Sequence, residues 1–474
     1  MNLLADLQVA LPDALLAGFG LAALLLAAIG GDRISALLRL LTVLALAAAA
    51  VLSFIQFPQG SAEAFNHLYR VTPFVLFAKG ATYALAALAL FMSGGFLRAS
   101  ALERYEYSLL TVFAAMGAGV MLSANDLMTL YVGIETLSLS SYVLAAFQRD
   151  SVKSAEAGLK YFVLGALASG LLLYGSSLIY GFAGSTNYQT IAAADDSVGL
   201  IFGLVLIICG LAFKASAAPF HVWTPDVYEG APAPVVAFFS TAPKIAAVIL
   251  LANVMFTTFG PHEKSWQMVI AIISAMSMLI GSFGALAQNS VKRILAYSSI
   301  SNVGFALIAI AAGAELGATA VLVYMTIYVI ATLGIFGGVM ALRRGGKAID
   351  DVSDLNGLAK LKPGMTLGLV ILIFSVAGIP PAAGFWGKIQ VFEAGLRADM
   401  LWLVLVGALS SVVSLGYYLR LVWAMMMKPP GEALDRTDFS VAATVLASSV
   451  ISFPVLTIGI QLLLDAAAAA APAG

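Results

Sequence analysis

The sequence predicts an all-α polytopic membrane protein with about fourteen transmembrane helices. Of its 474 residues, 61% are hydrophobic and only 10% are charged, whereas a soluble domain carries about 25% charged residues. Apolar runs of the roughly 20 residues needed to cross the hydrocarbon follow one another through the whole chain. Lysine and arginine also gather between alternate runs, as they do in polytopic proteins.

The predicted spans are separated by polar residues and turn residues. They lie near 10–30, 34–56, 72–97, 106–123, 126–147, 156–182, 198–229, 233–258, 266–287, 294–312, 316–341, 366–396, 400–427 and 439–464. We expect the seventh span, 198–229, and the twelfth, 366–396, to be broken, because prolines fall inside them and remove backbone donors. The N-terminus has no basic stretch before its apolar run, so a cleaved signal peptide is not expected.

The distribution of basic residues predicts the orientation, because cytoplasmic loops accumulate lysine and arginine. With the N-terminus outside, the outward loops receive only Arg70, Lys264 and Arg397. The inward ends receive Arg33, Arg39, Arg98, Arg104, Arg149, Lys153, Lys292, Arg293, Arg343, Arg344, Lys347, Lys360, Lys362, Lys428 and Arg436. Both termini are therefore predicted to lie outside.

Several classes of function are disfavoured by the composition. A net charge of -1 argues against a nucleic-acid surface. The one cysteine, Cys209, cannot build an iron–sulfur or structural zinc site alone, and the three histidines are scattered along the chain. No glycine-rich phosphate cradle stands in a strand–turn–helix setting. We expect no redox centre and no nucleotide site in this chain.

The segment from Lys214 to Lys244 combines two lysines in apolar sequence with five prolines, a lone His221 and the carboxylates Asp226 and Glu229. Backbone groups freed inside a membrane persist only if they are buried in protein or line a wet cavity. A broken helix beside buried lysines therefore predicts a place where water and protons reach the membrane interior.

The chain carries signs of an internal repeat. The break near Pro219 recurs about 160 residues later at Pro380 and Pro381, and the stretch from Asn125 resembles the stretch from Asn289 at a similar offset. Because five spans separate each element from its copy, the copies must be inverted, which is typical of transporters. Chance similarity of apolar sequence is the alternative. The predicted division is 1–104 for three N-terminal helices, 105–260 and 261–430 for two five-helix repeats, and 431–474 for a last helix.

Glu135 and Lys214 form the first candidate site, because each lies near the middle of its span. Ionisable groups at that depth are expensive and usually functional. An ion pair at 4 Å is worth about 4 kcal/mol at an effective dielectric of 20, more than the roughly 2.3 kcal/mol per charge that 100 mV imposes. One switchable pair could therefore drive a proton step. Helix–helix packing by a protonated Glu135 and snorkelling of Lys214 are the alternatives.

Lys244 and Lys388 are further candidates, because both lie deep in their spans and Lys388 follows the second break. His221 could relay protons near neutral pH or serve as a packing histidine. Lys160 is a possible relay, but Lys160 and Lys79 lie near the ends of their spans, where snorkelling is favoured.

The segment from His221, HVWTPDVYEGAPAPVVAFFSTAPKIAA, closely resembles the signature of the subunit N family of bacterial proton-pumping NADH:quinone oxidoreductase, respiratory complex I. The stretches GIETLSLSSYVL and GIPPAAGFWGK resemble the fifth and twelfth helices of that family. Its antiporter-like sister subunits usually carry a WLPDAH-type sequence where this chain has WTPDVYEG. The resemblance covers essentially the whole chain.

This resemblance implies a membrane-arm subunit that moves protons outward across the bacterial inner membrane, driven by quinone reduction elsewhere in the complex. It implies partners among the antiporter-like and small membrane subunits and the peripheral redox arm, with NADH, FMN, iron–sulfur clusters and quinone held by those partners. The residues that match the family's proton path are Glu135, Lys214, Lys244 and Lys388, with His221 and, less directly, Lys160. A subunit of a stand-alone cation/proton antiporter and a purely architectural spacer are the competing hypotheses.

Overall fold

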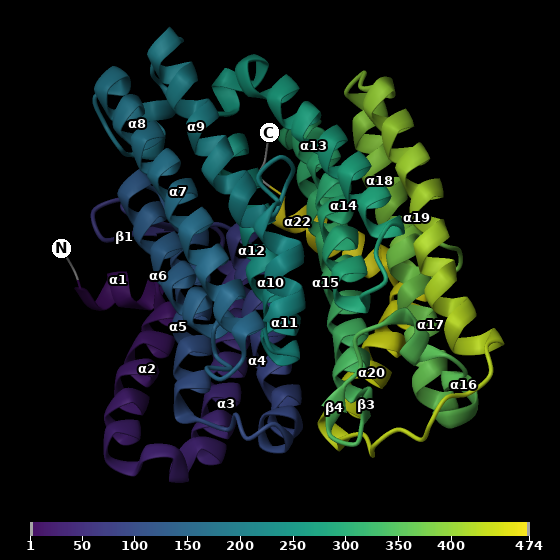
Figure 1. The fold of residues 1–474 in the computed structure, drawn as a ribbon. Helices are drawn as coiled ribbons and strands as arrows, with labels where there is room; N and C mark the ends of the chain where they lie inside the picture. Colours follow the sequence, from purple (N-terminus) through teal and green to yellow (C-terminus); the bar gives the residue numbers. More distant parts are fainter. Residues whose placement is uncertain (1–2, 472–474) are drawn as a thin grey trace.

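A computed structural model describes residues 3–471 (Figure 1). Within them, twelve stretches are long and apolar enough to cross a membrane. The first stretch, Leu11–Gln59, holds two helices that meet at a tight turn. Counting these two separately and adding the second broken helix gives the fourteen predicted crossings. The all-α membrane fold is confirmed.

The helices follow the predicted spans closely. The N-terminal part contains α1 (Leu3–Val9), α2 (Leu11–Gly30), α3 (Ser35–Gln56) and α4 (Pro73–Ala99). The next part contains α5 (Tyr105–Leu122), α6 (Leu127–Ala145), α7 (Val152–Ala183), α8 (Tyr188–Ala192), α9 (Val198–Ala215), α10 (Trp223–Gly230), α11 (Ala233–Phe239) and α12 (Ala242–Thr257). The remainder contains α13 (Glu263–Leu286), α14 (Val291–Ala311), α15 (Ala314–Ala341), α16 (Leu358–Leu361), α17 (Pro363–Ala377), α18 (Ala383–Arg397), α19 (Leu401–Met427), α20 (Phe439–Val450), α21 (Leu456–Ile458) and α22 (Ile460–Ala470).

The interior of the molecule is formed by α12, α14 and α15, which lie in the middle of Figure 1. In the apolar windows of α14 and of the stretch that joins α11 and α12, 94% of the residues are buried inside the protein, against 33% for the window of α2 and α3. The peripheral helices turn apolar side chains outward. This is the arrangement expected where hydrocarbon, and not water, surrounds the fold.

Both predicted breaks are present. Between α9 and α10 the chain leaves the helix at Ser216, whose φ is +64°. Between α17 and α18 it leaves at Gly378, whose φ is +80°. In each case a left-handed residue ends the first half-helix, and prolines prevent the helix from resuming at once.

The structure divides two further spans that we expected to be continuous. The eighth span is interrupted at Ser240 and Thr241, whose hydroxyls donate back to backbone carbonyls. The helix resumes as α12 at Ala242, with Pro243 in its first turn. The last span is interrupted around Pro454 and continues as α21 and α22. In both places a proline removes a backbone donor from the helical ladder.

Two short antiparallel hairpins lie in connecting loops and were not predicted. They are β1 (Ala62–Ala64) with β2 (Tyr69–Val71), and β3 (Arg343–Arg344) with β4 (Lys347–Ala348). The inverted relation between the two halves, and the division at residues 105, 261 and 431, remain predictions.

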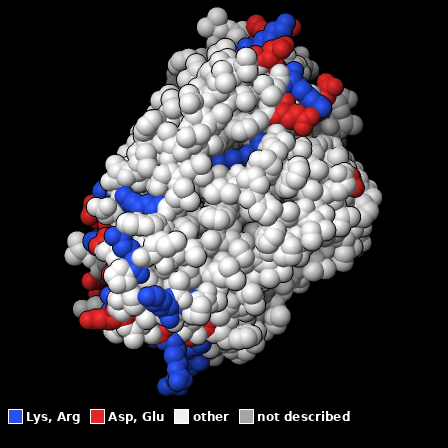
Figure 2. Space-filling view, turned by 90° about the vertical axis from the view of Figure 1, so that its right-hand side faces the viewer, with Lys and Arg blue, Asp and Glu red and all other residues white. Residues whose placement is uncertain are grey.

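The outer surface matches a bilayer. Figure 2 shows a broad, mostly uncharged face, with charged side chains gathered at its upper end and along its lower left edge. A wide uncharged band between two charged ends is the surface that a lipid-embedded protein presents.

Candidate functional site

Lys214 lies in the last turn of α9, beside α6. Its Nζ donates to Ser138 Oγ at 2.5 Å and lies 3.5 Å from the hydroxyl of Tyr142. The amine also stands 5.7 Å from the ring centre of Tyr142 and 5.5 Å from that of Phe213. Hydroxyl oxygens and ring faces thus solvate the ammonium in place of water.

Glu135 lies on α6 and accepts a hydrogen bond from Ser169 of α7. We expected a direct ion pair with Lys214, but in the part of the chain that the structure describes no ion pair joins the two side chains. Ser138, one helical turn from Glu135, takes the amine instead. The carboxylate and the amine thus each bond a different serine hydroxyl, Ser169 and Ser138.

Lys244 stands in the first turn of α12 and is almost completely buried. Its Nζ donates to Ser216 Oγ at 2.6 Å and to the carbonyl oxygen of Ala215 at 3.3 Å. Ala215 is the last residue of α9, so the cation sits at the negative end of a half-helix, where a positive charge is favoured. The unpredicted break in the eighth span lies just before Lys244.

Lys388 occupies the corresponding place at the second break. Its Nζ donates to the carbonyl oxygen of Ala377 at 2.9 Å and to Ser411 Oγ at 3.2 Å. Ala377 is the last residue of α17. Two buried lysines thus cap the two half-helices that end in left-handed residues, although Lys244 comes from a neighbouring helix and Lys388 from the helix half that follows the break.

Polar side chains line the interior beside Lys388. Ser298 of α14 bonds the hydroxyl of Tyr418 at 2.5 Å, and the hydroxyl of Tyr324 donates to Asn302 at 2.8 Å. Ser282 contacts Ser301 and Ser414 at 3.0 and 3.1 Å. These side chains supply hydrogen-bonding groups to the protein interior.

Further buried hydroxyls lie on the elements around Lys244. Those of Thr224, Tyr228 and Ser299 have no hydrogen-bond partner among the described residues. The ring of Tyr228 stands 6.0 Å from the Lys244 amine. Buried polar groups of this kind are normally satisfied by ordered water, so the interior around Lys244 is suited to hydration.

His221 lies in the turn between α9 and α10. It is half-buried, and its Nδ1 has no partner within residues 3–471. A ring nitrogen with no partner beside a helix break leaves the predicted relay possible, and the relay remains a prediction.

Lys160 belongs to a charged cluster toward the N-terminal end of α7. Its amine binds Asp226 at 2.6 Å and Glu156 at 2.8 Å. Asp226 and Glu229 also bind Arg293, at 2.8 and 2.9 Å. The Lys160 side chain is 41% exposed, so it reaches the surface as a snorkelling residue does.

For Lys79 the favoured prediction of snorkelling is wrong. Its side chain is completely buried, and its amine binds Asp13 at 2.7 Å, the hydroxyl of Tyr69 at 2.7 Å and Ser123 at 3.0 Å. Tyr83 also donates to Asp13. The position of Lys79 within its span could not reveal a partner 66 residues away in the sequence. The one available signal was Asp13 itself, a carboxylate inside the first apolar run.

Metal ligands do not converge in the described structure. Among the described residues, no three histidine, cysteine, aspartate or glutamate side chains form a group that could hold a metal ion. The expectation that redox groups belong to partner chains remains a prediction.

Comparison with known proteins places this arrangement in a family. The profile described as NADH:quinone oxidoreductase/Mrp antiporter, TM matches residues 124–414. The NADH-quinone oxidoreductase subunit N of Hirschia baltica is 58% identical over 475 residues, covering 100% of both chains. This chain belongs to the NADH-quinone oxidoreductase subunit N family.

Other members and solved structures agree. Subunit N of Rhodospirillum rubrum is 46% identical, covering 98% of this chain and 96% of that protein. A chain of respiratory complex I from Thermus thermophilus superposes with a TM-score of 0.85 at 32% identity, covering 97% of this chain and 99% of that one. A chain of the Mrp complex from Dietzia sp. superposes with a TM-score of 0.86, but at 24% identity it shows the fold alone. The subunit N fold is therefore an antiporter-like fold.

Proposed function

We propose that this chain is the proton-translocating subunit N of an NADH:quinone oxidoreductase. The observation that carries the proposal is the placement of Lys244 and Lys388, whose buried amines cap the broken half-helices at Ala215 and Ala377. A buried ammonium held by backbone carbonyls and serine hydroxyls can release its proton to water and take up another. Because the fold fixes the position of each lysine amine, its protonation state can change without movement of the backbone.

The proposed path uses the four deep residues in order. Protons reach Lys214 from the inner side, where the cluster around Asp226 and Arg293 offers charged groups at the surface. Lys244 then passes charge laterally to Lys388, through the hydroxyl-lined interior around α14. Glu135, on α6, controls through its negative charge whether the amine of Lys214 holds a proton. The path ends on the outward side, with both termini on that side as well.

The energy for this movement comes from partner subunits. NADH, FMN, iron–sulfur clusters and quinone belong to those partners, which include the peripheral redox arm and the other antiporter-like and small membrane subunits. The membrane is the bacterial inner membrane. This chain contributes to an enzyme as the translocating part of it.

A subunit of a stand-alone cation/proton antiporter is the second candidate, favoured by the likeness to the Mrp complex chain. Affinity purification from native membranes separates the two. We expect the chain to copurify with flavin- and iron–sulfur-bearing subunits and with NADH oxidation. Copurification with a cation antiporter complex that does not oxidise NADH would contradict the proposal.

The roles of Glu135 and Lys214 can be tested in the same preparation. Glu135→Ala and Lys214→Ala should lower proton pumping in NADH-energised vesicles while the complex still assembles. If the subunit is only an architectural spacer and its buried side chains only hold helices together, Lys214→Arg will disturb assembly and leave the number of protons moved per NADH unchanged. Unchanged pumping in both alanine variants, with intact assembly, would overturn the assigned roles.

A further inference from the structure

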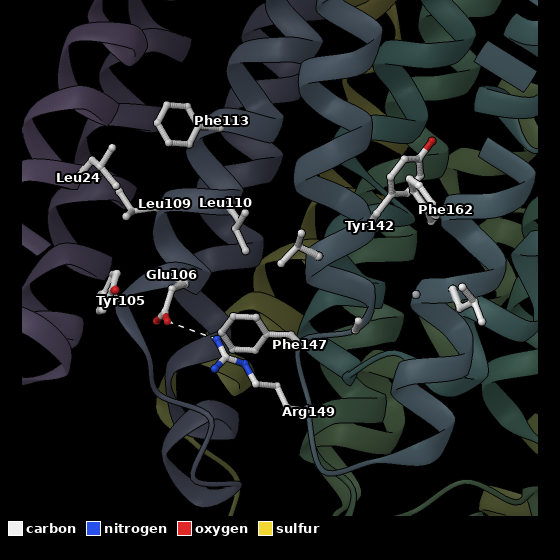
Figure 3. Close-up of a pocket in the computed structure, with 14 residues that line it drawn as sticks. Leu24, Tyr105, Glu106, Leu109, Leu110, Phe113, Tyr142, Phe147, Arg149 and Phe162 are labelled. Carbon is white, nitrogen blue, oxygen red and sulfur yellow. Dashed lines mark hydrogen bonds and ion pairs between the residues drawn. The ribbon is translucent and has the colours of Figure 1, made fainter. Parts of the chain in front are cut away.

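A groove of about 740 Å³ runs along the outside of the chain between α2 and the helices α5, α6 and α7 (Figure 3). Its lining includes none of the proposed proton-carrying lysines and none of the charged residues that surround Lys160. Its walls come from two parts of the chain that are separate in sequence, the N-terminal helices and the following helices. Its size falls within the range of about 300–1,000 Å³ that is common for ligand sites.

The walls of the groove are apolar and open toward the surroundings. Leu24, Val143 and Leu159 line it and are 46%, 53% and 63% exposed. Phe113 and Phe162 stand on opposite walls (Figure 3). In a bilayer, such a surface meets hydrocarbon, and an apolar groove excludes water.

One end of the groove is polar. Figure 3 shows Tyr105, Glu106 and Arg149 together there, with apolar side chains above them. The Arg149 side chain is 65% exposed, and its contact with Glu106 is a long 3.5 Å. Among the described residues Glu106 is its only ion-pair partner, so most of its five N–H donors remain available to an anion.

The opposite end reaches the proposed proton path. Tyr142 lines the groove, and its hydroxyl lies 3.5 Å from the Lys214 amine. The ring packs against Gly165, where an added Cβ would meet the hydroxyl oxygen at 2.0 Å. A molecule that fills the groove would therefore hold Tyr142 between itself and α7.

We propose that this groove binds a phospholipid, with its phosphate on Arg149 and an acyl chain along the apolar wall to Tyr142. The occupant follows from charge and shape together: a long apolar channel, open to the bilayer, ends at an exposed guanidinium on the predicted cytoplasmic side. Arginine pairs with phosphate through two parallel hydrogen bonds. Tyr142 lies roughly 10 Å deeper than Arg149 along the direction of α6, within reach of the middle of an acyl chain. The binding itself does not depend on the proposed function.

Photolabelling of the purified complex with phosphatidylglycerol that carries a diazirine in mid-chain tests the proposal. We expect the label on peptides of α5, α6 and α7, including the one with Tyr142. Arg149→Ala should lower the labelling about tenfold, because it removes a charge-assisted pair. Arg98→Ala is the matched control, since Arg98 is exposed near the C-terminal end of α4 and does not line the groove. Glu106→Gln should raise labelling, because it frees Arg149 and removes a negative charge.

A blocking variant gives an independent readout. Leu159→Trp should fill the groove and abolish labelling, whereas Leu167→Trp, two turns along the same helix and also 63% exposed, should leave it unchanged. Labelling that is insensitive to Arg149→Ala and Leu159→Trp would overturn the proposal. So would an unlabelled groove that cross-links to a helix of another subunit, or labelling that a quinone displaces and excess unlabelled phosphatidylglycerol does not.

Discussion

The ammonium nitrogen of Lys244 lies 3.3 Å from the carbonyl oxygen of Ala215, the last residue of α9. Lys388 stands in the same relation to Ala377 at the end of α17, at 2.9 Å. The last carbonyls of a helix have no intrahelical partner and carry a partial negative charge. Each helix break therefore exposes the carbonyl acceptor that a buried lysine needs. We conclude that the break and the lysine beside it act together.

Gly378 tests this relation at the second break. Its φ is +80°, and an added Cβ would stand 2.7 Å from Lys388 Cδ. Gly378→Ala should strain the left-handed cap by about 1–2 kcal/mol and displace the lysine from Ala377. We expect lower proton pumping at normal assembly, measured in NADH-energised vesicles. Gly364→Ala is the matched control, because a Cβ there meets nothing within 4 Å. Equal pumping in the two variants would count against the cap.

Ser216 tests the first break. Its hydroxyl accepts from Lys244 at 2.6 Å, and its φ is +64°. Ser216→Ala should remove only the hydrogen bond, worth about 0.6–2 kcal/mol inside a membrane, because alanine keeps the Cβ that serine already places in the left-handed backbone. Ser216→Gly should remove the same bond but also relieve the strain of that Cβ. We therefore expect alanine to lower the thermal unfolding midpoint of the complex more than glycine does, and the reverse order would contradict the assigned geometry.

Asp13 and Lys79 form a buried ion pair that ties α2 to α4. Removing one partner leaves an uncompensated buried charge, which costs about 3–5 kcal/mol. Asp13→Asn and Lys79→Met should each destabilise the assembled complex by that amount, and the double variant should be less destabilised than the sum. Thermal unfolding of the four proteins completes the cycle. Additive effects would mean that the two side chains do not interact.

Lys160 offers a contrast in exposure. Its side chain is 41% exposed and pairs with Asp226 and Glu156 near the surface, where an ion pair is worth only about 0–1 kcal/mol. Lys160→Ala should leave stability nearly unchanged and retain most of the proton pumping, unlike Lys388→Met. Pumping assays on the two variants check this. A loss of pumping in Lys160→Ala as large as that in Lys388→Met would make Lys160 an essential relay.

The helix count and the two proline-rich breaks were predictable from local sequence. Proline cannot continue a helix, and GIPPAAGFWGK and APFHVWTP carry that information within a few residues. The breaks before Lys244 and at Pro454 were missed, because apolar residues on both sides concealed single prolines within runs of adequate length. Hydropathy therefore predicts the number of transmembrane helices better than it predicts breaks within a helix.

The partners of the buried charges were less predictable than their depth. The sequence indicated that Lys214, Lys244 and Lys388 lie deep in their spans, and the structure gives each a hydroxyl or carbonyl acceptor. The sequence alone could not show that Lys214 bonds Ser138 and forms no ion pair with Glu135, or that Asp13 binds Lys79. These contacts join residues 66 or more positions apart, and only tertiary packing decides them.

The most direct test of the account is the number of protons moved per NADH oxidised in vesicles containing Lys244→Met. Methionine preserves most of the side-chain volume but cannot carry a proton, so the account predicts a lower ratio while the complex assembles and the partner subunits still oxidise NADH with an artificial electron acceptor. An unchanged ratio in a fully assembled complex would contradict the claim that the lysines at the helix breaks carry protons across the membrane.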